Sequence, residues 1–298
     1  MSQQELRRQL TDQIVQAIEN DNLLPWRRPW SVSPNAGRAA NVVSKKAYSG
    51  INPLLLEVHR LKHNLSSRWY GTFQQWKAKG MSVKPRPDHV KRGEWGERVA
   101  FFKPVTKKRI DEATGDEADD KFFVMRSYTV FSADQVDGAV QFQVNEEEAN
   151  SVVPDFAPAE ELIEGTEADI RFGGDQAFYH RKGDYIQVPH RHRFDPPGSY
   201  YETLLHELAH WSETRLGWDH EQQGYAMGEL VAEMASSFLA TELGVPQGED
   251  LDLGNHAAYL KSWLEAMKVD PAYLFRASTQ ASKVADYLLS FRPAPVVA

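Results

Sequence analysis

The segment His206-Glu207-Leu208-Ala209-His210 decides the interpretation of this chain. Two histidines four positions apart project from the same face of a helix, where they can bind one Zn²⁺. Glu207 lies one step round the helix, where a carboxylate can accept a proton from a water molecule activated by that ion. The spacing is typical of a zinc-dependent hydrolase, provided that the surrounding sequence forms a helix here.

Signals for two helices surround this segment. Ser199 and Glu202 have the spacing of a capping box and follow a Pro-Pro-Gly sequence, which predicts that a helix begins at Ser199. A second helix is predicted over residues 225–243, because Gly244 suits a left-handed cap and a proline follows shortly after it. Two consecutive helices could therefore contribute side chains to one site.

A catalytic zinc site usually has three protein ligands and an open position. Glu229 is predicted as the third ligand, because eighteen residues separate it from His210 and leave room for a loop and a returning helix. Glu233, one turn later, would accept a hydrogen bond from the other ring nitrogen of a ligand histidine. The two glutamates could also exchange these roles. Tyr225 and His220 precede the second helix and are candidate donors to an oxyanion.

Two other interpretations of these residues stay open. His206 and His210 could be ordinary helix residues, with Glu229 and Glu233 as solvated carboxylates. A bound ion could also be structural, but structural zinc sites usually have four protein ligands, often cysteines, and this chain has no cysteine. The residues favour Zn²⁺ at an open, catalytic type of site, with another divalent ion such as Mn²⁺ as the alternative.

The charge of the chain is divided unevenly. Residues 1–110 contain 21 Lys and Arg against 8 Asp and Glu, a net charge of +13, whereas residues 146–298 contain 11 against 26, a net charge of −15. This division suggests a polyanionic partner for the first part only. The lack of cysteine, of a signal-peptide pattern and of a long apolar run predicts a cytoplasmic protein without membrane contact, for which a monomer is the default.

Aromatic and basic residues alternate in the basic part of the chain. Exposed rings can stack on unpaired bases while cationic groups bind phosphates, and a duplex offers no accessible ring faces, so the pattern favours single-stranded DNA. The alternative is that the tryptophans are core residues whose basic neighbours lie on a solvated face. The residues predicted to contact DNA are Trp26, Arg27, Arg28, Trp30, Lys45, Lys46, Tyr48, Asn52, Arg68 and Trp69.

Several segments resemble the ArdC-like antirestriction proteins of conjugative plasmids. In the first half, the segments that are similar to the single-stranded-DNA-binding domain shared with TraC-type primases are PWRRPW at 25–30, YSGIN at 48–52 and YTVFS at 128–132. In the second half, those that resemble the zincin-like peptidase domain are DYIQVP at 184–189, YETLLHELAHW at 201–211 and ELVAE at 229–233. The resemblance covers nearly the whole chain, with the segments in the same order.

This resemblance implies a protein that meets a single DNA strand entering a recipient cell and protects it from restriction. It assigns the metal ligands to His206, His210 and Glu229, and the general base to Glu207. A protein substrate would then be a further partner. One alternative is a protein that shields DNA without turnover, whose metal domain is structural or serves recognition. A nuclease ranks last, because phosphodiester cleavage usually uses carboxylate-rich sites.

The predicted fold class is α+β, with two domains. Residues 1–145 form the basic single-stranded-DNA-binding domain, residues 146–158 the linker, and residues 159–298 a mostly helical zincin-like domain with a small β-sheet. Further helices are predicted over 255–268, 272–291 and 3–20, the last with a capping box formed by Ser2 and Glu5. Strands are predicted over 99–102, 121–131 and 141–144, with an acidic hairpin tip between the first two. Two more, over 177–180 and 184–189, are predicted to form a hairpin around a turn at 181–183. Residues 185–188 are expected at a sheet edge where a peptide could pair.

Overall fold

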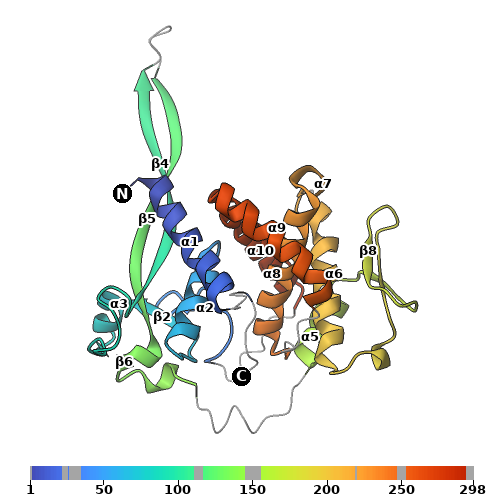
Figure 1. Ribbon diagram of the computed structural model, residues 1–298, viewed down its shortest axis with the longest axis horizontal. Helices are drawn as coiled ribbons and strands as arrows, with labels where there is room; N and C mark the ends of the chain where they lie inside the picture. The colour runs from blue at the N-terminus through green and yellow to red at the C-terminus, as the bar shows by residue number, and fades with distance from the viewer. Residues whose placement is uncertain are drawn as a thin grey trace.

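The two halves of the chain form different kinds of structure, as Figure 1 shows. The computed structural model describes residues 2–21, 26, 35–110, 117–144, 156–218, 220–246 and 253–292. Long strands dominate the first half and helices dominate the second half. The predicted α+β fold class is confirmed.

A four-stranded sheet, in the order β1-β2-β5-β4, forms the centre of the first half. β1 (Ala40–Asn41) runs parallel to β2 (Trp69–Thr72), and β2 pairs antiparallel with β5 (Glu117–Ser132). β5 and β4 (Glu97–Ile110) form a long hairpin that extends beyond the helices (Figure 1). The predicted hairpin is confirmed, and its tip, residues 111–116, lies outside the described residues.

The first helix, α1 (Gln3–Asp21), has the predicted bounds to within one residue. Its capping box is present, since the Ser2 Oγ accepts from the Glu5 N–H at 3.1 Å and the Ser2 N–H donates to the Glu5 carboxylate at 2.6 Å. The remaining elements of this half are α2 (Asn52–Lys62), α3 (Phe73–Ala78), β3 (Ser82–Val83), η1 (Ala133–Gln135) and β6 (Val136–Asp137).

The strand predicted over residues 141–144 is wrong. A short 3₁₀ helix, η2 (Val140–Phe142), takes its place. The Phe142 ring packs edge-on against Trp69 and Trp76, with centroids 6.1 and 5.9 Å apart. These contacts come from distant parts of the sequence and override the local strand preference of Gln141–Val144.

The second half begins with α5 (Ala157–Gly165) and a three-stranded sheet. β9 (Tyr185–Val188) lies between β7 (Asp169–Phe172), to which it is parallel, and β8 (Phe178–His180), to which it is antiparallel. The predicted hairpin is confirmed, but the prediction that residues 185–188 form an edge is wrong. β7 was missed because its sequence, Asp-Ile-Arg-Phe, has too few apolar residues to indicate a strand.

In the part of the chain that the structure describes, five helices follow the sheet, after a 3₁₀ turn η3 (Arg191–Arg193). They are α6 (Gly198–Arg215), α7 (His220–Gln223), α8 (Tyr225–Leu243), α9 (Leu253–Val269) and α10 (Ala272–Leu289). Within the described residues, no helix combines the length and the apolar character needed to cross a membrane.

The two helix boundaries predicted from caps differ in outcome. α8 ends as predicted, because Gly244 adopts the left-handed conformation with φ 69°. α6 begins at Gly198, so the capping box predicted at Ser199 is not formed. The carbonyl of Ser199 instead accepts a bond from the Thr203 hydroxyl at 2.8 Å inside the first turns of the helix.

A shared hydrophobic cluster joins the two halves. It contains Leu10 and Ile14 of α1 together with Leu204 of α6 and Leu274 of α10. Trp26, from the first half, is only 2% exposed, and its ring meets Trp263 of α9 edge-on at 6.2 Å. The halves are therefore packed together through their interiors as well as joined by the chain.

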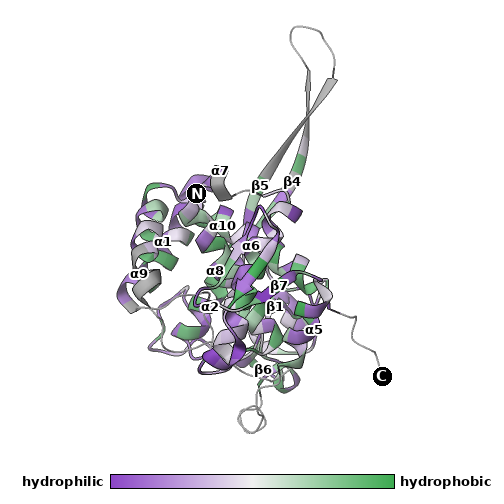
Figure 2. Ribbon diagram, turned by 90° about the vertical axis from the view of Figure 1, so that its right-hand side faces the viewer, coloured by the Kyte–Doolittle hydropathy of each residue, from purple (hydrophilic) through white to green (hydrophobic). Residues whose placement is uncertain are grey.

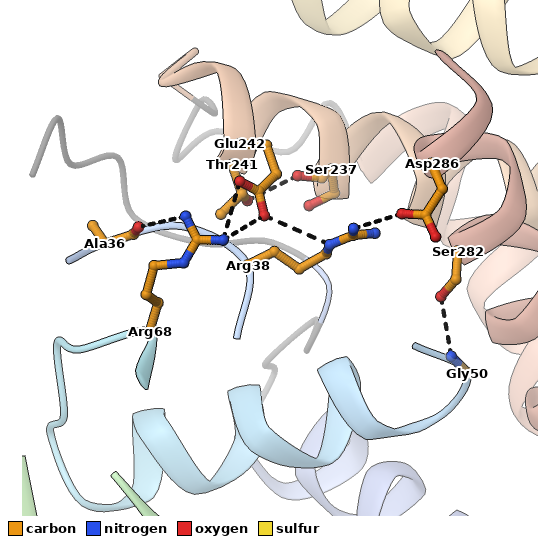
Figure 3. A network of polar contacts seen from close by, with 9 residues as sticks. All are labelled: Ala36, Arg38, Gly50, Arg68, Ser237, Thr241, Glu242, Ser282 and Asp286. Atoms are coloured by element: carbon orange, nitrogen blue, oxygen red, sulfur yellow. Dashed lines mark hydrogen bonds and ion pairs between the residues drawn. The ribbon is translucent and has the colours of Figure 1, made fainter. Parts of the chain in front are cut away.

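A polar clamp supplements this packing, as Figure 3 shows. The Arg68 guanidinium lies 2.9 Å from the Glu242 carboxylate of α8, and the Arg38 Nε lies 3.6 Å from the same carboxylate. Arg38 also pairs with Asp286 of α10 at 2.6 Å. Two arginines of the basic half thus hold the helix that carries Glu229.

Candidate metal centre

The side chains of His206, His210 and Glu229 converge on one point between α6 and α8. The two histidine Nε2 atoms lie 3.2 Å apart. The Glu229 carboxylate oxygens lie 3.5 Å from the His206 Nε2 and 3.6 Å from the His210 Nε2. Donors around a tetrahedral zinc with bonds of about 2.0–2.1 Å lie about 3.3 Å apart, so these separations suit one Zn²⁺.

Local sequence and helix packing together bring these donors into position. The histidines are four positions apart on α6, which places both rings on one face. Leu204, Leu205 and Leu208 are fully buried in the core cluster that also contains Leu230 of α8, so the two helices are packed together. The third donor comes from the second turn of α8, so no single helix could form the site.

Carboxylates also contact the outer nitrogens of both imidazoles. The His210 Nδ1 lies 2.8 Å from the Glu213 carboxylate, and the His206 Nδ1 lies 3.9 Å from that of Glu233. Glu233 is therefore beside a histidine, as the sequence suggested, whereas Glu213 was missed. Glu213 could have been identified from its position three residues after His210, on the same face of the helix. A carboxylate at this position fixes the tautomer that presents the Nε2 lone pair inward.

The electrostatics of the site favour a bound cation. Burial alone would lower the pKa of His206, but hydrogen bonding to Glu229 and the charges of Glu207 and Glu233 raise it to about 9. Burial alone would likewise raise the pKa of Glu229, but His206 and His210 lower it to about 2. In the metal-free protein, protonated His206 thus compensates the negative charge of the neighbouring Glu207, Glu229 and Glu233 carboxylates.

The other predicted site residues lie at different depths. Glu207 is buried beside the histidines on α6. Tyr225 is exposed at the start of α8, and hydrogen bonding with Tyr259, burial and the nearby Glu229 raise the pKa of its hydroxyl. Its position beside Glu229 suits a donor to a bound substrate. His220 belongs to α7, and its side chain lies outside the described residues.

Three of the residues predicted to contact DNA are buried. Trp26 lies in the shared core, and Tyr48 packs beneath the sheet. The Asn52 side-chain amide makes two hydrogen bonds to the backbone of Ala100 in β4. It donates to the Ala100 carbonyl at 2.9 Å and accepts from the Ala100 N–H at 2.7 Å. These side chains stabilise the fold and have no free ring face or amide for a base. Arg27, Arg28 and Trp30 lie outside the described residues.

The remaining predicted contacts are divided between structure and surface. Arg68 is used in the clamp to Glu242. Trp69 is partly buried, donates to the Asn35 side chain at 2.7 Å and lies 4.2 Å beneath the Lys45 ammonium. Lys45 and Lys46 are exposed. Among the described residues of the predicted set, only these two lysines are exposed.

Two family models match the chain. Residues 4–131 match the N-terminal domain of anti-restriction factor ArdC, and residues 157–280 match a zincin-like metallopeptidase. The chain is 32% identical over 294 residues to the uncharacterized protein y4eC of Sinorhizobium fredii, covering 94% of this chain and 90% of that protein. It is also 32% identical to two DNA primase TraC proteins of Escherichia coli, but spans only 27% and 19% of their lengths.

Two solved structures are similar over almost their whole length. The metal-free antirestriction ArdC protein from the R388 plasmid has 32% identity and a TM-score of 0.74, covering 97% of this chain and 100% of that chain. The Mn(II)-bound structure of the same protein has 30% identity and a TM-score of 0.71, covering 96% and 97%. With this shared architecture and a donor set that suits a divalent ion, the chain belongs to the ArdC-like antirestriction family and carries a zincin-like metallopeptidase domain.

Proposed function

We propose that this protein protects incoming conjugative DNA from restriction, that its basic half binds the single strand, and that its second half hydrolyses peptide bonds. The observation that carries the hydrolytic part is the convergence of His206, His210 and Glu229 beside the buried Glu207. The division into domains at residues 145 and 159 stays a prediction.

The site residues have distinct roles in this proposal. His206, His210 and Glu229 would hold Zn²⁺, which supplies Lewis acidity and a lowered pKa for water. Glu207 would take a proton from the attacking water and pass it to the departing amine. Tyr225 would donate its hydroxyl hydrogen to the carbonyl oxygen as negative charge develops there. Glu213 would keep the His210 imidazole oriented through its hydrogen bond, whereas Glu233 would act on His206 mainly through its charge.

Single-strand binding is supported by charge and by relatives. The net charge of +13 over residues 1–110 favours a polyanion, and the same region matches the N-terminal domain of an antirestriction factor. Relatives that share this region include DNA primases. A strand covered by the basic half would be a poor restriction substrate, so binding alone could protect it without hydrolysis.

The variant Glu207→Gln separates the hydrolytic function from shielding. It keeps the shape of the side chain and all three proposed ligands, so Zn²⁺ and single-stranded DNA should bind as in the wild type, whereas cleavage of proteins in a recipient-cell extract should stop. His206→Ala is the matched control that should lose the ion as well. If Glu207→Gln protects conjugating DNA as well as the wild type does, hydrolysis is not part of antirestriction and the shielding function stands alone.

A further inference from the structure

Two exposed aromatic rings lie on one face of the β4–β5 hairpin. Phe101 of β4 is 46% exposed and Tyr128 of β5 is 44% exposed. Phe101 lies opposite Arg126 and Tyr128 lies opposite Val99 in the strand register, so these four side chains are on the same face. The ring centroids are 5.6 Å apart and the planes meet at 78°. Large rings grouped in solvent mark a binding surface.

A buried side chain packs against the Phe101 ring and holds this face of the hairpin in place. Val99, on the same face as the rings, is fully buried in a cluster that also contains Tyr48, and the Tyr48 ring packs edge-on against Phe101 at 6.5 Å. On the opposite face of the hairpin, Phe102 is 42% exposed and packs against Phe275 of α10, with ring centroids 6.2 Å apart. Figure 2 shows β4 and β5 leaving the body of the protein beside α10. Phe101 and Tyr128, by contrast, lie against each other and are each nearly half exposed, so together they offer a stacking surface to a ligand.

Basic side chains flank the rings. Arg126 is directly opposite Phe101, and Lys103 is two residues further along β4 on the same face. Both are exposed. Flat rings beside cationic groups match a ligand with unpaired bases on a phosphate backbone. A duplex does not fit, because its base faces are stacked on one another.

We propose that single-stranded DNA stacks its bases on Phe101 and Tyr128 and places its phosphates beside Arg126 and Lys103. This assignment rests on the single-strand binding proposed above. It moves the stacking contact from the tryptophan-rich segments to the open face of the hairpin, where the exposed rings are.

Stacking and phosphate contacts respond differently to salt, which gives the test. The affinity for a fluorescein-labelled oligo-dT strand is measured by anisotropy over a range of KCl concentrations. Phe101→Ala and Tyr128→Ala should each weaken binding about tenfold with an unchanged salt slope. Arg126→Gln should lower the slope of log affinity against log salt by about 0.7. Phe73→Ala, which removes an equally exposed ring from α3, is the control and should change neither quantity.

The outcomes separate the two proposals. If the wild type does not bind oligo-dT, single-strand binding itself fails. If the wild type binds and both ring variants bind like Phe73→Ala, single-strand binding stands and the stacking face is wrong. A strand carrying 5-iododeoxyuridine provides a check in the unmodified protein, since ultraviolet cross-links should fall on Phe101 or Tyr128. Cross-links confined to other residues would overturn the assignment even if a variant folds poorly.

Discussion

The contact between Glu213 and His210 leads to a quantitative prediction for metal affinity. The Glu213 carboxylate is 4% exposed and 2.8 Å from the His210 Nδ1, so the bond is charge-assisted and shielded from water. Glu213→Gln keeps an acceptor oxygen but removes the charge. Loss of such outer contacts typically weakens metal binding by about 10- to 100-fold. We expect about tenfold weaker Zn²⁺ binding for Glu213→Gln, or about 1.4 kcal/mol, and a larger loss for Glu213→Ala.

The matched control for this prediction is Glu233→Gln. Its carboxylate is also buried, but it lies 3.9 Å from the His206 Nδ1, beyond hydrogen-bond distance. We expect a change of less than about threefold, because the remaining interaction is mainly coulombic. Affinities are measured by competition with a chromophoric chelator, and circular dichroism of the metal-free variants tests their folding. Wild-type affinity in folded Glu213→Gln, or a larger loss in Glu233→Gln, would refute the reasoning.

Three further predictions concern protonation, the clamp and the core. At pH 7, Zn²⁺ must displace the proton that the raised pKa of about 9 keeps on His206, so calorimetry in two buffers should show release of about one proton per ion. Protonated His206 also stabilises the metal-free fold: this contribution is complete below the unfolded pKa of about 6.5 and is lost as the pH rises through 9. An unchanged free energy of unfolding in denaturant over that pH range would contradict this prediction. Glu242→Gln should lower the free energy of unfolding by about 2–3 kcal/mol, because Arg68 loses its partner in a mostly buried clamp; a wild-type urea midpoint would argue against this. Trp26→Ala should cost about 3 kcal/mol by creating a cavity, while the folded protein keeps its affinity for oligo-dT, and a selective loss of that affinity would restore Trp26 as a DNA contact.

Local patterns in the sequence predicted the parts of the fold that depend on neighbouring residues. The capping box at Ser2 and the left-handed Gly244 each specify a helix end through contacts a few residues away. The spacing of His206 and His210 likewise needs only the helix period. Glu229 was chosen because a third ligand was required, and the structure brings it within 3.6 Å of both histidine Nε2 atoms.

Features that depend on distant contacts could not be predicted in this way. The central position of β9 depends on β7, whose polar sequence has no strand pattern. Trp26 and Tyr48 are aromatic residues with basic neighbours, as expected of a DNA contact, and only tertiary packing shows that they are buried. The Phe101 face required the register of two strands and the exposure of each ring in the folded protein. Propensity and composition contain none of this information.

The central claim is that one divalent ion is held between α6 and α8. Crystals of the zinc-loaded protein, with anomalous scattering recorded above and below the zinc edge, test it most directly. One strong peak is expected about 2.0–2.2 Å from the His206 Nε2, the His210 Nε2 and a Glu229 carboxylate oxygen. A peak held by other residues, or a zinc-saturated crystal with no peak between the two helices, would contradict it.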